Sequence, residues 1–172
     1  MNKIAVFGKP ASGKSTLCKK LAKKTAIKLY PLDLIEYHKN GQKKSLQEYQ
    51  IAHDKILNSE NWIIDGLGTI DSFWSRLDAA DTLIYIDIPY WQSYWWASKR
   101  LLISPFVKPQ GWPEGSSVLK GTIASWKYLR LSPKFWTHEF LKKIQDLAKN
   151  KRLYHIKTVK GLNGFIDHWH SD

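Results

Sequence analysis

A loop near the beginning of the chain has the residue types and the spacing needed to hold a row of phosphate groups. Gly8 and Gly13 frame the pattern G-x-x-x-x-G-K-[ST], with an apolar run before it and an amphipathic segment after it, a context that disfavours a chance glycine turn. The glycines let the backbone turn so tightly that successive amide groups point inward around an anion. Lys14 would supply charge to the β- and γ-phosphates, Ser15 a hydroxyl to Mg²⁺, and Thr16 a contact to the α-phosphate. The predicted ATP-binding residues are Gly8, Lys9, Pro10, Ala11, Ser12, Gly13, Lys14, Ser15 and Thr16.

An aspartate at the end of a later apolar run is the candidate metal ligand. The stretch WIIDG, residues 62–66, ends a predicted strand in Asp65, which can hold Mg²⁺ directly or through water, or else cap the following loop. Motor-type ATPases and helicases place a glutamate beside this aspartate to activate water, but here Gly66 follows it. Asp87 is not followed by a glutamate either, and the chain has no N/T-K-x-D string for reading guanine. These features favour phosphoryl transfer to a bound acceptor over hydrolysis or a GTPase switch.

A transfer reaction needs water to be excluded, and one stretch of the chain fits that task. The segment SPFVKPQGWPEGSS, residues 104–117, is rich in proline and glycine and fits no periodic element. Long loops of this kind inside compact domains are usually lids, binding loops or disordered segments. We interpret residues 103–118 as a lid that closes over the reaction.

The elements that must position these residues alternate along the chain. Five short apolar runs are typical of parallel strands buried on both faces. Segments with helical spacing lie between them, so the pattern predicts a single α/β domain over residues 1–172, a three-layer sandwich around a five-stranded parallel sheet. The predicted strands are 3–7, 27–33, 62–65, 82–88 and 153–157. The predicted helices are the segment directly after the loop, where Leu17, Leu21 and Ala22 have helical spacing, and then 43–58, 71–80, 90–102 and 133–149.

Helix starts and buried faces can be assigned in three of these segments. Asp71 is a plausible N-cap for the helix at 71–80. Ser132 as N-cap and Pro133 at the first helical position form a start signal for the helix at 133–149. The helix at 43–58 is predicted to turn one apolar face inward, formed by Leu46, Tyr49, Ile56 and Leu57.

Composition limits the partners. The chain carries 27 Lys and Arg against 15 Asp and Glu, a net charge of +12, which favours polyanions but also fits a solvated basic surface. Its one cysteine, Cys18, excludes an intramolecular disulfide and suits a reducing compartment. No apolar stretch is long enough to span a bilayer, and we see no secretory leader. We expect a soluble cytoplasmic protein without a membrane partner; nothing indicates its oligomeric state.

Longer motifs support a resemblance. They are the phosphate loop, YPLDLIEY (30–37), WIIDG, SRLDAADTLIYIDIP (75–89), a Trp-rich segment ending in KRLL, and GWPEG. With these motifs the chain resembles the small-molecule kinases related to adenylate and shikimate kinases, most closely the bacterial group of DNA topology modulation proteins. The resemblance covers nearly the whole chain. It implies the fold of P-loop nucleoside triphosphate hydrolases, in its nucleoside monophosphate kinase-like form.

The resemblance also implies roles for individual residues. Asp33, at the end of the second strand, would face the acceptor and orient or deprotonate its hydroxyl; the alternative is a helix N-cap. Arg76 would contact an anionic acceptor, or else be a solvated helix residue. Lys99 and Arg100 would stand at the entrance of the lid and close on the transferring group, or else only favour a helix C-terminus. The resulting catalytic set is Lys14, Asp33, Asp65 and Arg100, with Asp33, Arg76 and Lys99 toward the substrate and Ser15 and Asp65 toward the metal.

Two further positions concern the ligands. The loop around 158–161 would pass near adenine, by analogy with adenylate kinases. Leu67 stands where the family tends to carry a polar residue, and the acceptor motif D-G-F-P-R of adenylate kinases is absent, so the acceptor stays open.

Three functions remain open from the sequence. The main hypothesis is an ATP- and Mg²⁺-dependent kinase with a small acceptor. The alternatives are a nucleic-acid-associated ATPase that modulates DNA topology, and a nucleotide-binding protein without chemistry.

Overall fold

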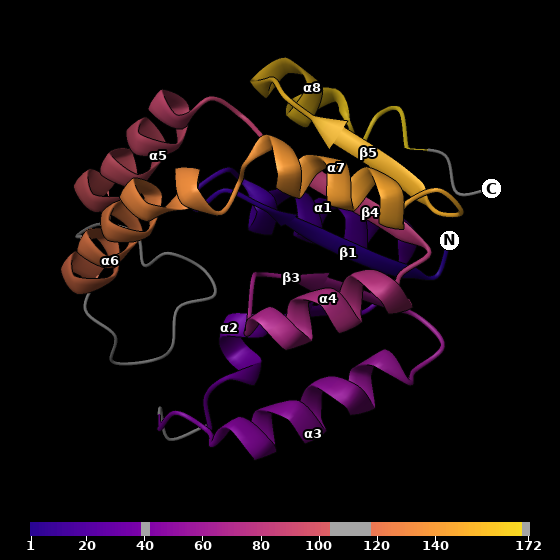
Figure 1. The fold of residues 1–172 in the computed structure, drawn as a ribbon. Coiled ribbons are helices and arrows are strands. Elements are labelled where there is room, and N and C mark those ends of the chain that lie inside the picture. The colour runs from indigo at the N-terminus through magenta and orange to yellow at the C-terminus, as the bar shows by residue number, and fades with distance from the viewer. Residues whose placement is uncertain (39–41, 104–117, 170–172) are drawn as a thin grey trace.

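The five predicted strands form one sheet. A computed structural model describes residues 1–38, 42–103 and 118–169 of the chain. In these residues the strand order is β2-β3-β1-β4-β5 (Figure 1). Every strand pair is parallel, so the carboxyl ends of all strands meet at one edge of the sheet. The strands are β1 (Lys3–Gly8), β2 (Leu29–Pro31), β3 (Trp62–Asp65), β4 (Thr82–Ile86) and β5 (Arg152–Ile156).

Helices cover both faces of the sheet, which confirms the predicted α/β three-layer architecture (Figure 1). Side chains on each strand alternate between the faces. Ile4 and Val6 of β1 join a cluster with α1 and α8, while Ala5 and Phe7 join a cluster with α3, α4 and α7. The helices are α1 (Lys14–Thr25), α2 (Leu32–Ile35), α3 (Leu46–Leu57), α4 (Ile70–Ala79), α5 (Tyr90–Ile103), α6 (Val118–Leu131), the 3-10 helix η1 (Ser132–Lys134), α7 (His138–Leu147) and α8 (Val159–Gly164).

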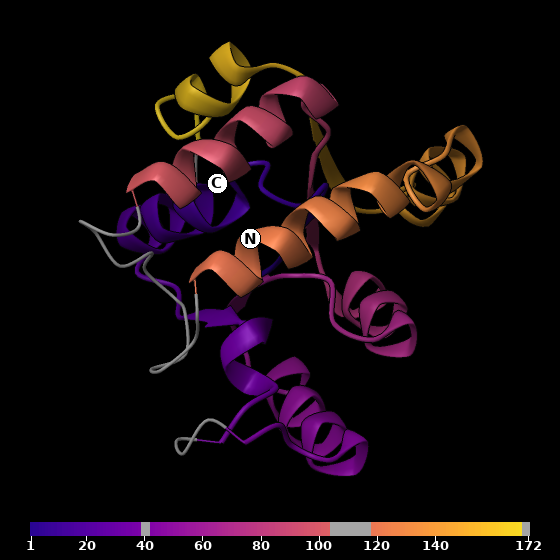
Figure 2. The same cartoon turned by 90° about the vertical axis from the view of Figure 1, so that its left-hand side faces the viewer.

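Helices α5 and α6 pack against each other beyond the carboxyl edge of the sheet (Figure 2). Helix α5 agrees with the helix predicted at 90–102, whereas α6 was not predicted. The predicted lid at 103–118 lies almost wholly outside the described residues. Within the described part of the chain, no helix is long and apolar enough to cross a membrane.

The predicted starts of two helices are wrong, because other side chains cap them. Ser132 does not begin α7; it is the first residue of η1, and its hydroxyl donates to Leu129 O and to the Tyr90 hydroxyl. Thr137 caps α7 instead, accepting a hydrogen bond from the amide of residue 140. Similarly, Thr69 rather than Asp71 caps α4.

The buried face of α3 also differs from the prediction. Ser45 and Glu48 form a capping box, so the helix begins at Leu46, whose side chain is 64% exposed. The side chains that point into the core are Tyr49, His53 and Ile56. The prediction that Leu46 faces the core is therefore wrong; it is the first residue of α3 and is exposed.

Candidate active site at the carboxyl edge of the sheet

The phosphate loop connects β1 to α1 in a conformation that requires its glycines. Gly8 has a φ of 143°, and a Cβ atom there would lie 2.1 Å from the carbonyl oxygen of Ile86. Gly13 is the N-cap of α1 with a φ of 88°, and no side chain caps the helix. The first amides of α1 are therefore left for a ligand, as at anion-binding helix termini. Ala11, with a φ of 52°, adds local strain.

Lys14 lies half-buried and is held by the loop itself. Its Nζ donates hydrogen bonds to Lys9 O at 2.6 Å and to Gly8 O at 3.0 Å. Loss of hydration lowers the pKa of Lys14, and the charges of Asp65 and Asp33 counter part of that effect. These two carbonyl oxygens accept the hydrogen bonds that the Lys14 ammonium would otherwise donate to phosphate oxygens. Ser15 and Thr16 follow on α1 and are exposed.

Asp65 is buried at the end of β3, beside Lys14. It is 6% exposed, and its Oδ1 has no hydrogen-bond partner. An orphaned carboxylate oxygen next to a phosphate loop fits Mg²⁺, which prefers oxygen ligands. Among the described residues there is no cluster of three or more His, Cys, Asp or Glu that could hold a metal. A metal ion here would need phosphate oxygens to complete its ligands, as expected for a magnesium nucleotide.

Two other residues of the predicted catalytic set reach the same place. Asp33 lies in the first turn of α2, so the prediction that it ends a strand or caps a helix is wrong; Pro31 is the N-cap. Loss of hydration and the charges of Asp65 and Glu36 raise the pKa of Asp33, although the residue keeps an exposed surface. Arg100, half-buried on α5, contributes to the lowered pKa of Lys14, and its own pKa is lowered by burial.

Lys14 is the common neighbour of this set: the charges of Asp65, Asp33 and Arg100 all act on it, and the charge of Asp65 also acts on Asp33. They come from α1, α2, β3 and α5. Lys99, the neighbour of Arg100, is exposed, because successive helix residues point in different directions. It does not join this group in the described structure.

Arg76 occupies neither of its expected places. It is completely buried, so the solvated alternative is wrong, and in this conformation its surface is not available to an acceptor. Its Nη2 donates to Gly66 O at 2.8 Å and to Leu67 O at 3.4 Å, which holds the loop that follows Asp65. Burial lowers the pKa of Arg76 to about 10, and the charges of Tyr49 and Asp65 oppose this effect.

A cavity of about 190 Å³ opens beside the phosphate loop, between α1, α5 and α8. Its volume is several times the share of one water molecule, about 30 Å³. The aromatic ring of Trp96 and the side chain of Leu162 approach Gly13 most closely. The sequence analysis missed Trp96; its spacing of four residues from Arg100, which places both on one helix face, was the available signal. The lining residues are Gly13, Thr16, Leu17, Lys20, Trp96, Leu162 and Asn163.

A second hollow, of about 420 Å³, lies on α3 and is lined by that helix alone. One helix surface cannot enclose a ligand, and none of the four clustered residues lies there. We therefore place the candidate site at the phosphate loop.

Comparison with known structures agrees with this architecture. No protein-family model and no curated protein sequence matches the chain. Shikimate kinase from Acinetobacter baumannii, solved in complex with shikimate, aligns with a TM-score of 0.56 at 15% identity, over 97% of this chain and 89% of the other. The chain has the fold of shikimate kinase. A sugar kinase from Janibacter sp., solved without ligand, aligns with a TM-score of 0.49 at 12% identity, over 95% of this chain and 89% of the other.

The shikimate kinase fold confirms the fold class that the sequence predicted. At 15% identity the likeness concerns the fold alone. The resemblance to DNA topology modulation proteins stays a prediction.

Proposed function

We propose that the protein is a phosphotransferase that uses ATP and Mg²⁺ and moves the γ-phosphoryl group to a small hydroxyl-bearing acceptor. The observation that carries this proposal is a phosphate loop with an uncapped helix start, whose Lys14 senses the charges of Asp65, Asp33 and Arg100. These four side chains come from four separate elements. Phosphoryl transfer needs this combination of cations and carboxylates, because catalysis is mostly positioning and charge stabilisation.

The loop and Lys14 form the donor side. The amides of residues 8–16 bind the phosphate oxygens, and Lys14 leaves the carbonyls of Gly8 and Lys9 to bind the β- and γ-phosphates. Mg²⁺, when bound, neutralises charge on these phosphates. Ser15 and Asp65 would hold it. Arg100 stabilises the charge that gathers on the transferred group, and its partial burial strengthens this attraction.

Asp33 belongs to the acceptor side. A carboxylate whose pKa is raised is a better proton acceptor than an ordinary one, so Asp33 suits orientation and deprotonation of the acceptor hydroxyl. Arg76 holds the loop that follows Asp65 by donating hydrogen bonds to the carbonyl oxygens of Gly66 and Leu67. It acts as a positioning residue.

Transfer is favoured over hydrolysis by the residue after Asp65. Gly66 has a φ of 120°, and a Cβ atom there would lie 3.1 Å from Leu32 Cβ. The backbone at this position strains any other residue, so a water-activating glutamate is not accommodated there. This geometry explains why glycine follows the aspartate.

The base of the nucleotide would lie in the cavity beside the loop. Thr16, the proposed α-phosphate contact, lines that cavity, so the nucleoside continues into it from the phosphates. Trp96 offers an aromatic face for stacking, and Asn163 an amide that can bind the edge of the base. Thr158 caps α8 by accepting a hydrogen bond from Gly161 N at 3.0 Å, which fixes this wall.

Labelled ATP and a panel of hydroxyl metabolites test the proposal. We expect one acceptor class to raise turnover at least tenfold above slow hydrolysis, and Lys14→Met to abolish the increase. Lys23→Met, an exposed lysine on the same helix, is the control. Turnover that no acceptor raises would contradict the proposal.

One alternative has an observation of its own. The net charge of +12 favours a nucleic-acid-associated ATPase. That function predicts DNA affinity that falls steeply with salt through counterion release, and ATP hydrolysis that DNA stimulates. Filter binding over a salt series, with heparin as a competing polyanion, separates it from non-specific attraction.

A further inference from the structure

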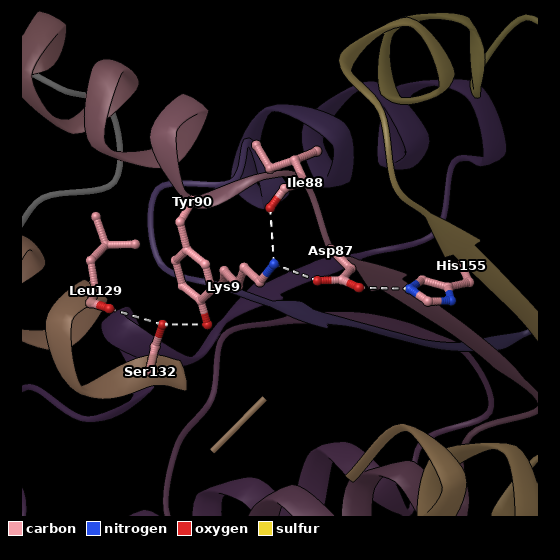
Figure 3. A network of polar contacts seen from close by, with 7 residues as sticks. All are labelled: Lys9, Asp87, Ile88, Tyr90, Leu129, Ser132 and His155. Atoms are coloured by element: carbon pink, nitrogen blue, oxygen red, sulfur yellow. Dashed lines mark hydrogen bonds and ion pairs between the residues drawn. The ribbon is translucent and has the colours of Figure 1, made fainter. Parts of the chain in front are cut away.

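The phosphate loop carries a second lysine whose side chain is buried at the edge of the sheet. Lys9 Nζ lies 2.5 Å from Asp87 Oδ1, and the Lys9 side chain is 10% exposed (Figure 3). The ammonium also donates a hydrogen bond to Ile88 O at 3.0 Å. It sits 4.2 Å from the ring centroid of Tyr90, the first residue of α5. Lys9 is therefore tied to the end of β4 and to the start of α5.

Asp87 is itself held by the neighbouring strand β5. Its Oδ2 lies 3.0 Å from His155 Nε2 on β5 (Figure 3). Burial and the charge of Asp87 raise the pKa of Tyr85, so its phenol stays protonated near the carboxylate. The rings of Tyr85 and His155 stack with centroids 4.8 Å apart. The carboxylate that receives Lys9 is thus fixed in place.

The position of this ion pair relates it to the loop. The ladder between β1 and β4 ends at the pair Gly8 and Ile86. Lys9 and Asp87 are the next residues on the two chains. Their side chains therefore continue the connection at the point where the backbones separate and the phosphate loop begins.

The loop needs such a restraint once nucleotide is bound. Gly8, Ala11 and Gly13 all have positive φ, and Ala11 pays for it with strain because it has a side chain. In the free protein, Lys14 holds the loop through the carbonyls of residues 8 and 9. Those bonds are lost when Lys14 turns to phosphate.

We propose that the Lys9–Asp87 ion pair positions the phosphate loop, keeping it in its anion-binding conformation both in the free protein and when Lys14 exchanges carbonyl oxygens for phosphate. The inference rests on the proposed function. Lys9 is a positioning residue and does not touch the phosphates. Through Tyr90, whose hydroxyl accepts a hydrogen bond from Ser132 at 3.1 Å, the same anchor fixes the start of the helix that carries Arg100.

A double-mutant cycle on MgATP affinity tests this role. Lys9→Met and Asp87→Asn are each expected to weaken binding on the order of tenfold, because a displaced loop misaligns its amides. The double variant should be no weaker than either single one, since both changes break one connection. If Lys9 instead attracts phosphate by its charge, Asp87→Asn will strengthen binding, and that result overturns the proposal. Additive losses overturn it too.

Two variants control for general damage to the fold. Lys9→Arg keeps the charge that pairs with Asp87, so it should lose less affinity than Lys9→Met. Lys151→Met removes a lysine that also donates to backbone carbonyls, those of Leu77 and Asp78, and should leave affinity unchanged. Thermal unfolding shows which variants are folded, and Lys9→Gln replaces Lys9→Met if the latter is not.

Hydrogen exchange without nucleotide separates this inference from the proposed function. The amides of residues 9 and 11–13 should exchange faster in Lys9→Met and Asp87→Asn than in the wild type and Lys151→Met. Unchanged exchange would overturn the positioning role even if ATP binds. A wild type that binds no ATP would defeat the proposed function, while this measurement still reports on the ion pair.

Discussion

The hydrogen-bonding arrangements of the Asp65 and Lys14 side chains in the free protein are energetically unfavourable. Asp65 Oδ1 is buried without a hydrogen-bond partner, and Lys14 gives its donors to backbone carbonyls. Both are costly for charged groups, because burial removes hydration that these contacts replace only in part. A magnesium nucleotide would supply the missing partners to both residues. We therefore interpret this strain as part of the binding site.

Asp33 should show a conflict between activity and stability. We expect Asp33→Asn to lower kcat by about 10²-fold or more, because the acceptor hydroxyl loses its base. The same change should raise the free energy of unfolding at pH 7. The folded-state pKa of Asp33 is raised by lost hydration and by Asp65, so its ionised form is disfavoured in the folded protein. Rate measurements and urea unfolding of both proteins check the two effects.

The sign of the pH dependence gives a second check on Asp33. As the pH falls from the raised folded-state pKa of Asp33 to its unfolded value near 3.9, Asp33 becomes protonated in the folded wild type. The difference in the free energy of unfolding between Asp33→Asn and the wild type therefore shrinks over this pH range. Asp71→Asn is the matched control, since Asp71 is also an exposed aspartate in the first turn of a helix. It should lose about 0.3–1 kcal/mol through the helix dipole. A loss of stability in both variants would contradict our account of Asp33.

The helices and strands differ in how far the sequence determines them. The strands were predictable because Ile63, Ile84 and their neighbours form apolar runs buried on both faces. The phosphate loop was predictable because its conformation demands glycine at fixed positions. Helix α6 was missed because it packs mainly on α5 and carries exposed apolar side chains such as Tyr128, which blur its periodicity. The burial of Arg76 and the tie between Lys9 and Asp87 depend on distant segments, which local patterns do not encode.

The two adjacent tryptophans of α5, Trp95 and Trp96, should contribute differently to nucleotide binding. Trp96 lines the cavity beside the loop, whereas Trp95 is 56% exposed. We expect Trp96→Leu to weaken MgATP binding on the order of tenfold, because stacking on a base contributes about 1–3 kcal/mol. Trp95→Leu should have no effect. Calorimetry with inorganic tripolyphosphate should give equal affinity for all three proteins, since that ligand has no base; a loss for tripolyphosphate in Trp96→Leu would contradict the assignment.

The residues that stabilise the fold and the residues proposed to bind the nucleotide lie in different parts of the protein. Two apolar clusters on the faces of the sheet contain most of the large buried side chains, and residues such as Phe7 and Leu21 contribute about 1.5–3 kcal/mol each. The phosphate loop, Asp33 and Arg100 lie at the carboxyl edge, outside these clusters, so a change there can abolish binding while the fold persists.

Ligand-induced stabilisation tests this separation. MgATP at a hundredfold excess over its Kd should add about 2.7 kcal/mol to the free energy of unfolding of the wild type, and so raise Tm by about 5–11 °C for a chain of this size. Lys14→Met should abolish the shift, because it removes the cation that binds the β- and γ-phosphates. Its Tm without ligand should stay within about 2 °C of the wild type: the variant loses two hydrogen bonds to loop carbonyls but no longer buries a charge. Differential scanning calorimetry with and without MgATP measures both quantities, with Lys23→Met as the exposed control. An undiminished shift in Lys14→Met would mean that the nucleotide stabilises the protein from some other place, and the loop would lose its assigned role.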